Sequence, residues 1–263
     1  PCAGSAEFYS LEEQEIVETV AVTRRVVGED GIVMAPIGNQ IRQAVSLGHK
    51  SIEAGADVLL FMPLTGPYLS DAGANSYYSE ILKAVDCPSV IYKKASIPSD
   101  SLLMQLAEDP KVVGIKYADN NIDSFQRIVR DCRGSVEWFS GSAERFAPFF
   151  MLAGATGYTS GAGNLCPHLT LAMHATATAG NWSKVLELQA IIRPIEEFRS
   201  RDGDSYNISF LKYALTRSGL DFGPPRPPQR QLTLGEKTEI DEIMIPIIKA
   251  EEDLVAATAT QPA

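Results

Sequence analysis

Short apolar segments recur along the first two thirds of the chain, at residues 31–36, 56–63, 88–94, 112–118, 136–141 and 155–161. Between them, apolar residues lie three or four positions apart, a spacing typical of helices. These helical stretches cover residues 11–27, 40–54, 74–85, 99–108, 122–131 and 143–153. Continuously apolar strands that alternate with amphipathic helices predict a parallel sheet covered by helices on its outside.

The loop sequences indicate whether this sheet is an open, doubly wound sheet or a closed barrel. A doubly wound nucleotide-binding sheet would usually carry a glycine-rich phosphate loop after its first strand. The nearest glycine cluster, GYTSGAG at 157–163, has neither that spacing nor that position. The repeating units, together with a strand end at 1–3, favour a (β/α)8 barrel. They give seven strands, so we expect this chain to lack the first βα unit of the barrel.

The pattern becomes entirely helical from about residue 180. It predicts helices over 182–198 and 205–218, and one or two helices over 234–256 that end in a frayed Ala/Thr tail. The proline-rich strap GPPRPP at 223–228 cannot lie inside a helix. We therefore predict a catalytic barrel core over residues 1–180 and C-terminal helices over 181–263, packed on the barrel within the same domain.

Charge and composition narrow the classes of partner. The chain carries 45% hydrophobic and 21% charged residues, a globular balance, and a formal net charge of −10 at pH 7. Nucleic-acid binding needs a basic surface, so we expect no nucleic-acid partner. Without a basic cluster or an apolar run long enough to span a bilayer, we expect no membrane partner either.

Cysteine and histidine usage bears on location and on metals. The four cysteines lie far apart, at Cys2, Cys87, Cys132 and Cys166. They predict reduced, mostly buried thiols and a cytoplasmic protein rather than a disulfide scaffold. The three histidines form neither an HxH nor an HExxH pattern, so we predict no metal site.

Lys116 stands out because it ends an apolar strand, VVGIK. In a parallel barrel the functional groups lie at the C-terminal ends of the strands. A buried lysine tends to lose its charge, and the neutral amine is the nucleophile that forms a Schiff base. The alternative is that Lys116 points outward and keeps its ammonium group in solvent.

Two further strand ends carry candidate groups. Tyr92 ends the preceding strand, PSVIY, and a phenol beside an imine-forming lysine can relay protons. The alternative for Tyr92 is a half-buried tyrosine with a satisfied hydroxyl. Ser5 lies in the small-residue turn after residues 1–3, where backbone N–H groups can hold a carboxylate, although an ordinary tight turn would look the same.

At these positions the chain resembles the dihydrodipicolinate synthase/N-acetylneuraminate lyase family. The similar segments are PCAGSAEFYSL (1–11), VIY (90–92), GIK (114–116) and GYTSGAGNLCP (157–167). The resemblance covers essentially the whole chain, in order. It implies a class I Schiff-base barrel enzyme that acts on 2-keto acids, needs no cofactor beyond the covalent imine, and forms a homo-oligomer, either a dimer or a tetramer.

The resemblance also implies roles for individual residues. Lys116 would form the imine and Tyr92 would relay protons. The substrate's α-keto carboxylate would lie against Gly4 and Ser5, and the rim of the same pocket would carry Thr159 and Ser160. In the family, about one strand and one helix precede the segment that matches residues 1–11, which agrees with a missing first βα unit.

The departures from the synthase pattern favour another branch. Adjacent threonines are replaced by Gly4 and Ser5, a tyrosine pair by Leu64 and Thr65, and an arginine by Ile97. The segments GSAEFYSL (4–11) and SAERFAP (142–148) are instead similar to the 5-dehydro-4-deoxyglucarate dehydratase branch. This similarity adds Ser142 and Glu144 as substrate-binding candidates, although a solvated carboxylate at a helix start is the simpler interpretation of Glu144.

Lys94 is a candidate for recognising a second carboxylate. Strand alternation puts Lys94 on the same face as Tyr92, and Lys93 on the opposite face, where Lys93→Met should change turnover of a diacid or a monoacid little. An inward Lys94 would pair with the distal carboxylate of a diacid sugar, whereas an outward one would be a surface cation.

We therefore predict a lyase that uses Lys116 on a small-molecule 2-keto sugar acid. The closest activity is the dehydration and decarboxylation of 5-dehydro-4-deoxyglucarate. The alternatives are a pyruvate-releasing aldolase for a 2-keto-3-deoxy sugar acid, a dihydrodipicolinate synthase-like condensation, and a catalytically silent barrel that binds a 2-keto acid.

Overall fold

The computed structural model describes residues 1–259, which divide into two compact units. Unit 1 contains Pro1–Gly141 and Leu152–Thr156, and unit 2 contains Ser142–Met151 and the chain from Gly157 onward. The predicted boundary at residue 180 stays a prediction. None of the helices in residues 1–259 combines the length and the apolar character that crossing a bilayer requires.

Unit 1 is built on five parallel strands that pair in chain order. They are β1 (Met34–Ile37), β2 (Val58–Phe61), β3 (Ser89–Lys93), β4 (Val112–Tyr117) and β5 (Glu137–Ser140). β2 to β5 each lie inside a predicted apolar segment, and β1 extends one residue beyond the segment 31–36. Most of their side chains are buried, as expected for a parallel sheet shielded from water on both faces.

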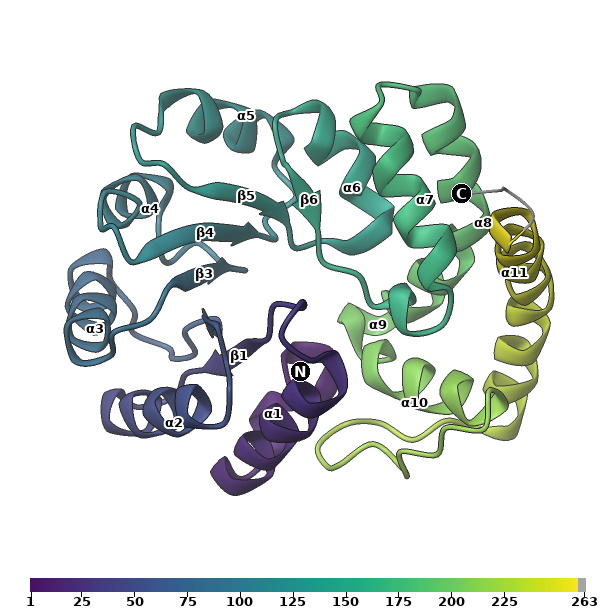
Figure 1. Ribbon diagram of the computed structural model, residues 1–263, viewed down its shortest axis with the longest axis horizontal. Helices are drawn as coiled ribbons and strands as arrows, with labels where there is room; N and C mark the ends of the chain where they lie inside the picture. The colour runs from purple at the N-terminus through teal and green to yellow at the C-terminus, as the bar shows by residue number, and fades with distance from the viewer. Residues whose placement is uncertain (260–263) are drawn as a thin grey trace. The chain divides into compact units, whose positions relative to one another are not determined.

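The helices of unit 1 lie outside these strands (Figure 1). They are α1 (Glu13–Val27), α2 (Ile41–Glu53), α3 (Asp71–Ala84), α4 (Asp100–Leu106) and α5 (Ile122–Asp131), and every bound agrees with the prediction to within three residues. Three begin at a side chain that accepts a hydrogen bond from the first turn, namely Ser70, Ser99 and Asn121. Such caps satisfy N–H groups that have no partner within the helix.

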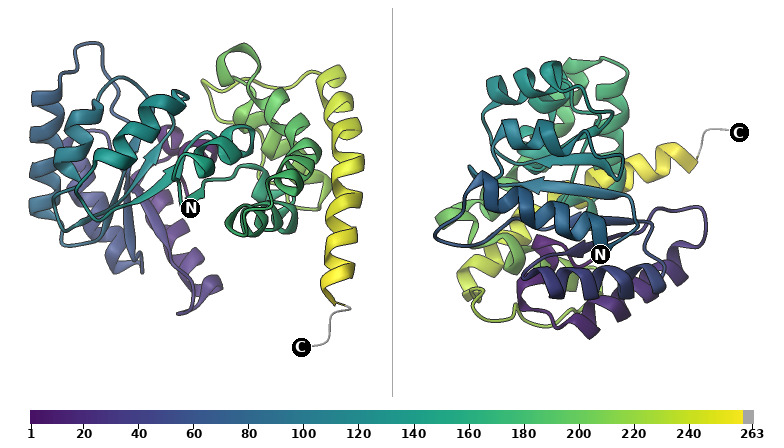
Figure 2. Two further views of the ribbon diagram at one scale, coloured as in Figure 1. Left: turned by 90° about the horizontal axis from the view of Figure 1, so that it is seen from above. Right: turned by 90° about the vertical axis from the view of Figure 1, so that its left-hand side faces the viewer.

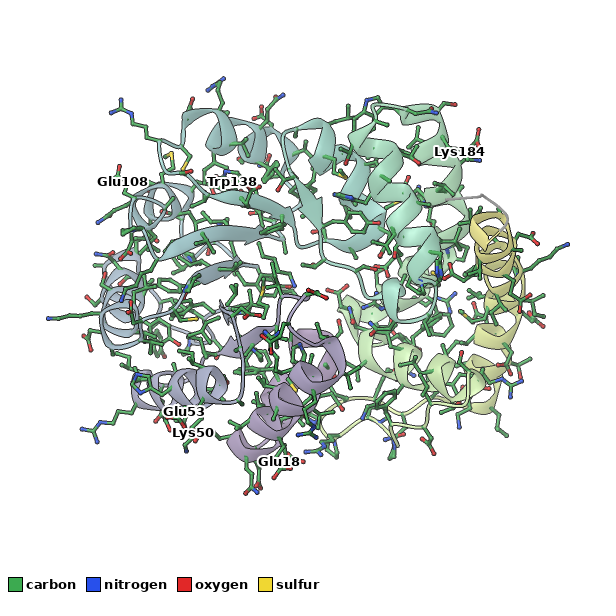
Figure 3. The ribbon with its side chains drawn as sticks, viewed as in Figure 1. Glu18, Lys50, Glu53, Glu108, Trp138 and Lys184 are labelled. Atoms are coloured by element: carbon green, nitrogen blue, oxygen red, sulfur yellow. The ribbon has the colours of Figure 1, made fainter. Side chains whose placement is uncertain are left out.

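In unit 1, polar helix residues are exposed and apolar strand residues are buried, as the hydrophobic pattern predicts (Figure 3). Glu18, Lys50, Glu53 and Glu108 are exposed and point away from the strands. Trp138 on β5 is buried, and its ring lies 5.9 Å from that of Phe125 on α5. Aromatic packing of this kind fixes the helix on the sheet.

The predicted strand end at residues 1–3 is wrong. Cys2 has a φ of +54°, and η1 (Gly4–Ala6) follows directly. A residue in the left-handed region cannot continue an extended strand. Residues 1–259 therefore contain six strands rather than seven, of which β6 (Gly157–Tyr158) belongs to unit 2.

Unit 2 is mainly helical. Its elements besides β6 and η3 (Ala162–Asn164) are α6 (Ala143–Leu152), α7 (Pro167–Thr178), α8 (Trp182–Arg199), α9 (Arg201–Asp204), α10 (Asn207–Arg217) and α11 (Leu234–Ala259). The predicted helices over 143–153, 182–198, 205–218 and 234–256 are confirmed, and the strap at 223–228 is not helical. The predicted frayed tail lies partly outside residues 1–259.

Helix α11 lies along the outside of the other helices of unit 2 (Figures 1 and 2). The aromatic centre of this unit joins α8 to α10, because the Phe198 and Phe210 rings lie 5.3 Å apart. Helix α7 was not predicted. Its first N–H groups, at His168 and Leu169, donate to the carboxylate of Glu251 on α11, each over 2.8 Å. This cap comes from far along the chain, so the local sign of a helix start is Pro167 at the first helical position, which a turn would share.

Candidate active site

Lys116 and Tyr92 lie opposite each other on β4 and β3, in direct register. Residues in register on neighbouring parallel strands point to the same side of the sheet. The Lys116 Nζ lies 3.9 Å from the centre of the Tyr92 ring, and Tyr92 is 9% exposed. The structure therefore brings the two predicted catalytic residues together at the C-terminal ends of their strands.

The surroundings of Lys116 favour a neutral amine. Burial, followed by the positive charge of Lys94, lowers the pKa of Lys116 to about 8. The ordinary pKa of a lysine is about 10.4, so the neutral fraction at pH 7 rises from roughly 0.04% to roughly 10%. Only the neutral amine can attack a carbonyl carbon.

Gly141 lets the chain after β5 pass close to the stem of the Lys116 side chain. A Cβ atom on Gly141 would lie 3.2 Å from the Cγ of Lys116 and 2.7 Å from the Cβ of Ala118. The Gly141 N–H donates to the Tyr117 carbonyl over 2.6 Å, which holds the backbone there. Any larger residue would push against Lys116. Sequence reasoning missed Gly141, because a glycine after a strand also marks an ordinary turn.

The turn with Gly4 and Ser5 lies at the same edge of the sheet. A Cβ on Gly4 would lie 3.9 Å from the side chain of Met62, which directly follows β2. Gly4 is half-buried and Ser5 is exposed. Because the C-terminal ends of parallel strands share one edge, the turn lies on the side of the sheet where Tyr92 and Lys116 end their strands. Carboxylate binding by this turn stays a prediction.

The two neighbouring lysines have different surroundings. Lys94 is exposed, and its charge acts on Lys116. Lys93 is buried and donates hydrogen bonds to the carbonyls of Ala95 and Pro98. That replacing Lys93 changes turnover little stays a prediction, but its loss would leave the carbonyls of Ala95 and Pro98 without this donor and should cost stability.

Four candidates belong to unit 2, and the structure joins two of them. Ser142 and Thr159 are half-buried. The Ser160 hydroxyl donates to Glu144 Oε1 and accepts from the Gly163 N–H over 2.6 Å. Glu144 is 0% exposed, so its interpretation as a solvated carboxylate at a helix start is wrong.

Glu144 belongs to a buried polar cluster. Nearby, Glu196 forms an ion pair with Arg199, which also donates to the Asn207 side chain over 2.6 Å. Burial and then the charge of Glu196 raise the pKa of Glu144 to about 7, against the lowering effects of Ser160 and Arg199. The Oε2 atom of Glu144 has no hydrogen-bond partner within residues 1–259. Glu144 therefore holds a proton near neutral pH.

This proton predicts a pH-dependent stability that Glu144→Gln should remove. The folded-state pKa is above the ordinary value of about 4.3, so the folded protein binds the extra proton and loses stability as the pH rises from about 4.5 to 7. The loss amounts to about 3 kcal/mol. In melting experiments, Glu144→Gln should gain stability over the wild type between pH 5 and pH 8.

The matched control is Glu187→Gln, which removes an exposed carboxylate on α8. It should keep the same small difference from the wild type at both pH values. If Glu144→Gln also differs from the wild type equally at pH 5 and pH 8, Glu144 is ionised throughout this range.

No group of three metal-ligating side chains occurs in the part of the chain that the structure describes. The cysteines are free, and three of the four are buried. That the enzyme needs no cofactor stays a prediction.

The family model described as the dihydrodipicolinate synthetase family matches residues 2–246. The chain belongs to the dihydrodipicolinate synthetase family. It is a lyase of this family, with the family's (β/α)8 barrel fold and a C-terminal helical extension.

Its relatives carry two kinds of name. The solved structure of a dihydrodipicolinate synthase from Oceanobacillus iheyensis is similar, with a TM-score of 0.89 and 34% identity, covering 93% of this chain and 82% of that one. A Streptomyces griseus protein named probable 5-dehydro-4-deoxyglucarate dehydratase is 29% identical over 92% of this chain and 78% of its own. A Corynebacterium diphtheriae 4-hydroxy-tetrahydrodipicolinate synthase is 26% identical over 91% and 78%.

Proposed function

We propose that this family member is a class I Schiff-base lyase for a 2-keto sugar acid, with 5-dehydro-4-deoxyglucarate as its substrate. One observation carries the proposal: the Lys116 amine lies against the ring of Tyr92 at the C-terminal ends of two parallel strands, with a lowered pKa. A neutral amine next to a phenol is the pair that imine chemistry needs.

The reaction begins when the Lys116 amine attacks the keto carbon of the substrate. Loss of water gives an imine, which draws electrons from the neighbouring carbon and makes its C–H bond acidic. Tyr92 moves protons between the substrate and its surroundings. Removal of that proton expels the hydroxyl group on the next carbon as water. Loss of carbon dioxide and hydrolysis of the imine then free the product and restore Lys116.

The choice of substrate rests on similarity and on charge. Several relatives carry the dehydratase name, at 28–29% identity. The arginine of the synthase pattern is replaced by Ile97, and Lys94 offers a cation near the Lys116 amine instead. A diacid needs a second cationic group for its distal carboxylate, so Lys94 supports a diacid substrate.

Lys94→Met tests the substrate class. A charge-assisted pair is worth about 1.5–3 kcal/mol, so turnover of 5-dehydro-4-deoxyglucarate should fall by roughly ten- to a hundredfold. Turnover of the monoacid 2-keto-3-deoxygluconate should not suffer this loss of recognition. Lys94 also lowers the pKa of Lys116, so Lys94→Met should raise that pKa and reduce turnover of both substrates near pH 7. The measurement is therefore the diacid-to-monoacid ratio of kcat/KM above pH 8.

The control is Lys83→Met on α3, which should leave this ratio unchanged. An unchanged ratio in Lys94→Met, or a wild type that never turns over the diacid, would exclude the glucarate assignment. Release of pyruvate from a monoacid would then favour an aldolase. Consumption of an aldehyde together with pyruvate would favour a condensation. Adduct formation without turnover would favour a catalytically silent barrel that binds a 2-keto acid.

Two further properties belong to this proposal. By family resemblance the enzyme acts as a homo-oligomer on a small-molecule substrate alone. The free and mostly buried thiols support a cytoplasmic location.

A further inference from the structure

A buried ammonium group lies at the C-terminal end of β3. Lys93 is 3% exposed, and its Nζ donates hydrogen bonds to the Ala95 carbonyl over 3.0 Å and to the Pro98 carbonyl over 2.9 Å. The Oδ1 of Asp100 lies 3.7 Å from the same nitrogen. An ammonium group leaves water at a large cost unless hydrogen bonds and an opposite charge replace its hydration. These acceptors therefore tie Lys93 to the residues that follow it, the β3–α4 loop (residues 94–99).

The far end of the β3–α4 loop is fixed by other residues. The Ser99 N–H donates to Asp71 over 2.9 Å, and the Ser99 side chain caps α4. The Tyr117 hydroxyl donates to Asp100 over 3.1 Å. Of the two hydrogen bonds from Lys93, the one to Pro98 lies next to these contacts, and the one to Ala95 holds the loop near its start, next to Lys94.

The first residue of this loop is electrically linked to the active site. Lys94 lies two residues after Tyr92, and Tyr92 is in register with Lys116, so strand alternation brings Lys94 to the side of the sheet where the Lys116 amine lies. The charge of Lys94 also lowers the pKa of Lys116. Lys93 itself is in register with Tyr117, whereas Tyr92 is in register with Lys116. Lys93 therefore faces the side of the sheet opposite to the Lys116 amine, and any effect on that amine must pass through the loop.

We propose that Lys93 is a positioning residue, which binds the carbonyls of Ala95 and Pro98 and so holds Lys94 beside the Lys116 amine. The inference deepens the proposed function and rests on it, because that amine is taken as the nucleophile. Without the Lys93 ammonium group the loop loses its side-chain hydrogen bonds at Ala95 and Pro98, and Lys94 moves away from the Lys116 amine. The amine then becomes more basic, and the distal carboxylate of a diacid loses its cation.

The test measures the Lys116 amine without any substrate. Acetic anhydride labels neutral amines, and mass spectrometry of the Lys116 peptide over a pH series gives the midpoint of its titration. Lys93→Met should raise this midpoint by about half a pH unit, the effect of losing one nearby like charge. In turnover assays above pH 8, it should raise KM for the diacid at least about tenfold and change kcat by less than about threefold.

Lys111→Met provides a matched structural control. Lys111 also donates to two backbone carbonyls, of Leu82 over 2.8 Å and Val85 over 3.2 Å, and pairs with Asp86, but it lies at the N-terminal end of β4. Its loss should lower the melting temperature while leaving the Lys116 midpoint and KM unchanged. Should Lys93→Met not fold, Lys93→Gln keeps a hydrogen-bond donor and should shift the midpoint less, in the same direction.

The double variant separates a positioning role from a general loss of stability. If Lys93 acts through Lys94, then Lys93→Met adds no further midpoint shift or KM change to Lys94→Met. The proposal is overturned if the two effects add, or if Lys93→Met lowers the melting temperature and moves neither readout, as Lys111→Met does. A wild type that forms no imine would refute the proposed function instead, and the labelling midpoints would still be readable.

Discussion

Lys116→Ala is expected to abolish turnover of every 2-keto acid substrate and to leave no adduct that borohydride can trap. The reason is chemical: without the amine, no imine forms, and the neighbouring C–H bond keeps its ordinary acidity. Side chains that only bind substrate would each lower the rate in part. In the proposed mechanism Lys116 alone carries the covalent step, so its loss is the largest effect that we expect.

The fold should survive this change. Burial disfavours the charged form of Lys116, so removing the amine relieves a cost while the loss of packed methylene groups adds one. We expect a melting temperature within a few degrees of the wild type. The control is Lys94→Ala, which should retain a trapped adduct with pyruvate. An adduct that persists in Lys116→Ala would assign the chemistry to another lysine.

Tyr92→Phe is expected to lower kcat by roughly 10²- to 10⁴-fold, the range for loss of a positioned acid–base group. The ring that packs against the Lys116 Nζ at 3.9 Å is kept, so the amine should stay in place. The variant should therefore still form an imine that borohydride traps. The measurement combines single-turnover kinetics with trapping, which separates imine formation from proton transfer.

Tyr78→Phe is the matched control for this prediction. Tyr78 is also buried in unit 1, and its hydroxyl has no hydrogen-bond partner within residues 1–259. Removing that hydroxyl should leave kcat unchanged. If Tyr92→Phe also keeps the wild-type kcat, the tyrosine serves only as a packing surface for Lys116.

The parts of the structure that the sequence predicts well are those with local causes. Strands buried on both faces are apolar throughout, as VLLF in β2 is, and their helices begin at short polar caps such as Ser70 and Ser99. The proximity of Lys116 and Tyr92 was predictable because each places a reactive group at the end of an apolar strand. The register of the two strands then brings the two side chains together.

The parts that escaped prediction depend on distant partners. Helix α7 is capped by Glu251, 83 residues away from His168. The sequence indicates a solvated carboxylate at a helix start for Glu144, yet its burial next to the Glu196–Arg199 pair raises its pKa. Lys93 resembles a surface lysine until the loop after it folds back and brings the Pro98 carbonyl to its ammonium group.

The most direct test of the central claim is the mass of the reduced adduct on the wild-type enzyme. The protein is incubated with pyruvate, treated with borohydride so that any imine becomes a stable secondary amine, then digested and analysed by mass spectrometry. The account predicts one added pyruvate-derived group, on the peptide that contains Lys116 and on its Nζ. A group found on Lys94, Lys93 or any other lysine, or no adduct with pyruvate or any 2-keto sugar acid, would contradict it.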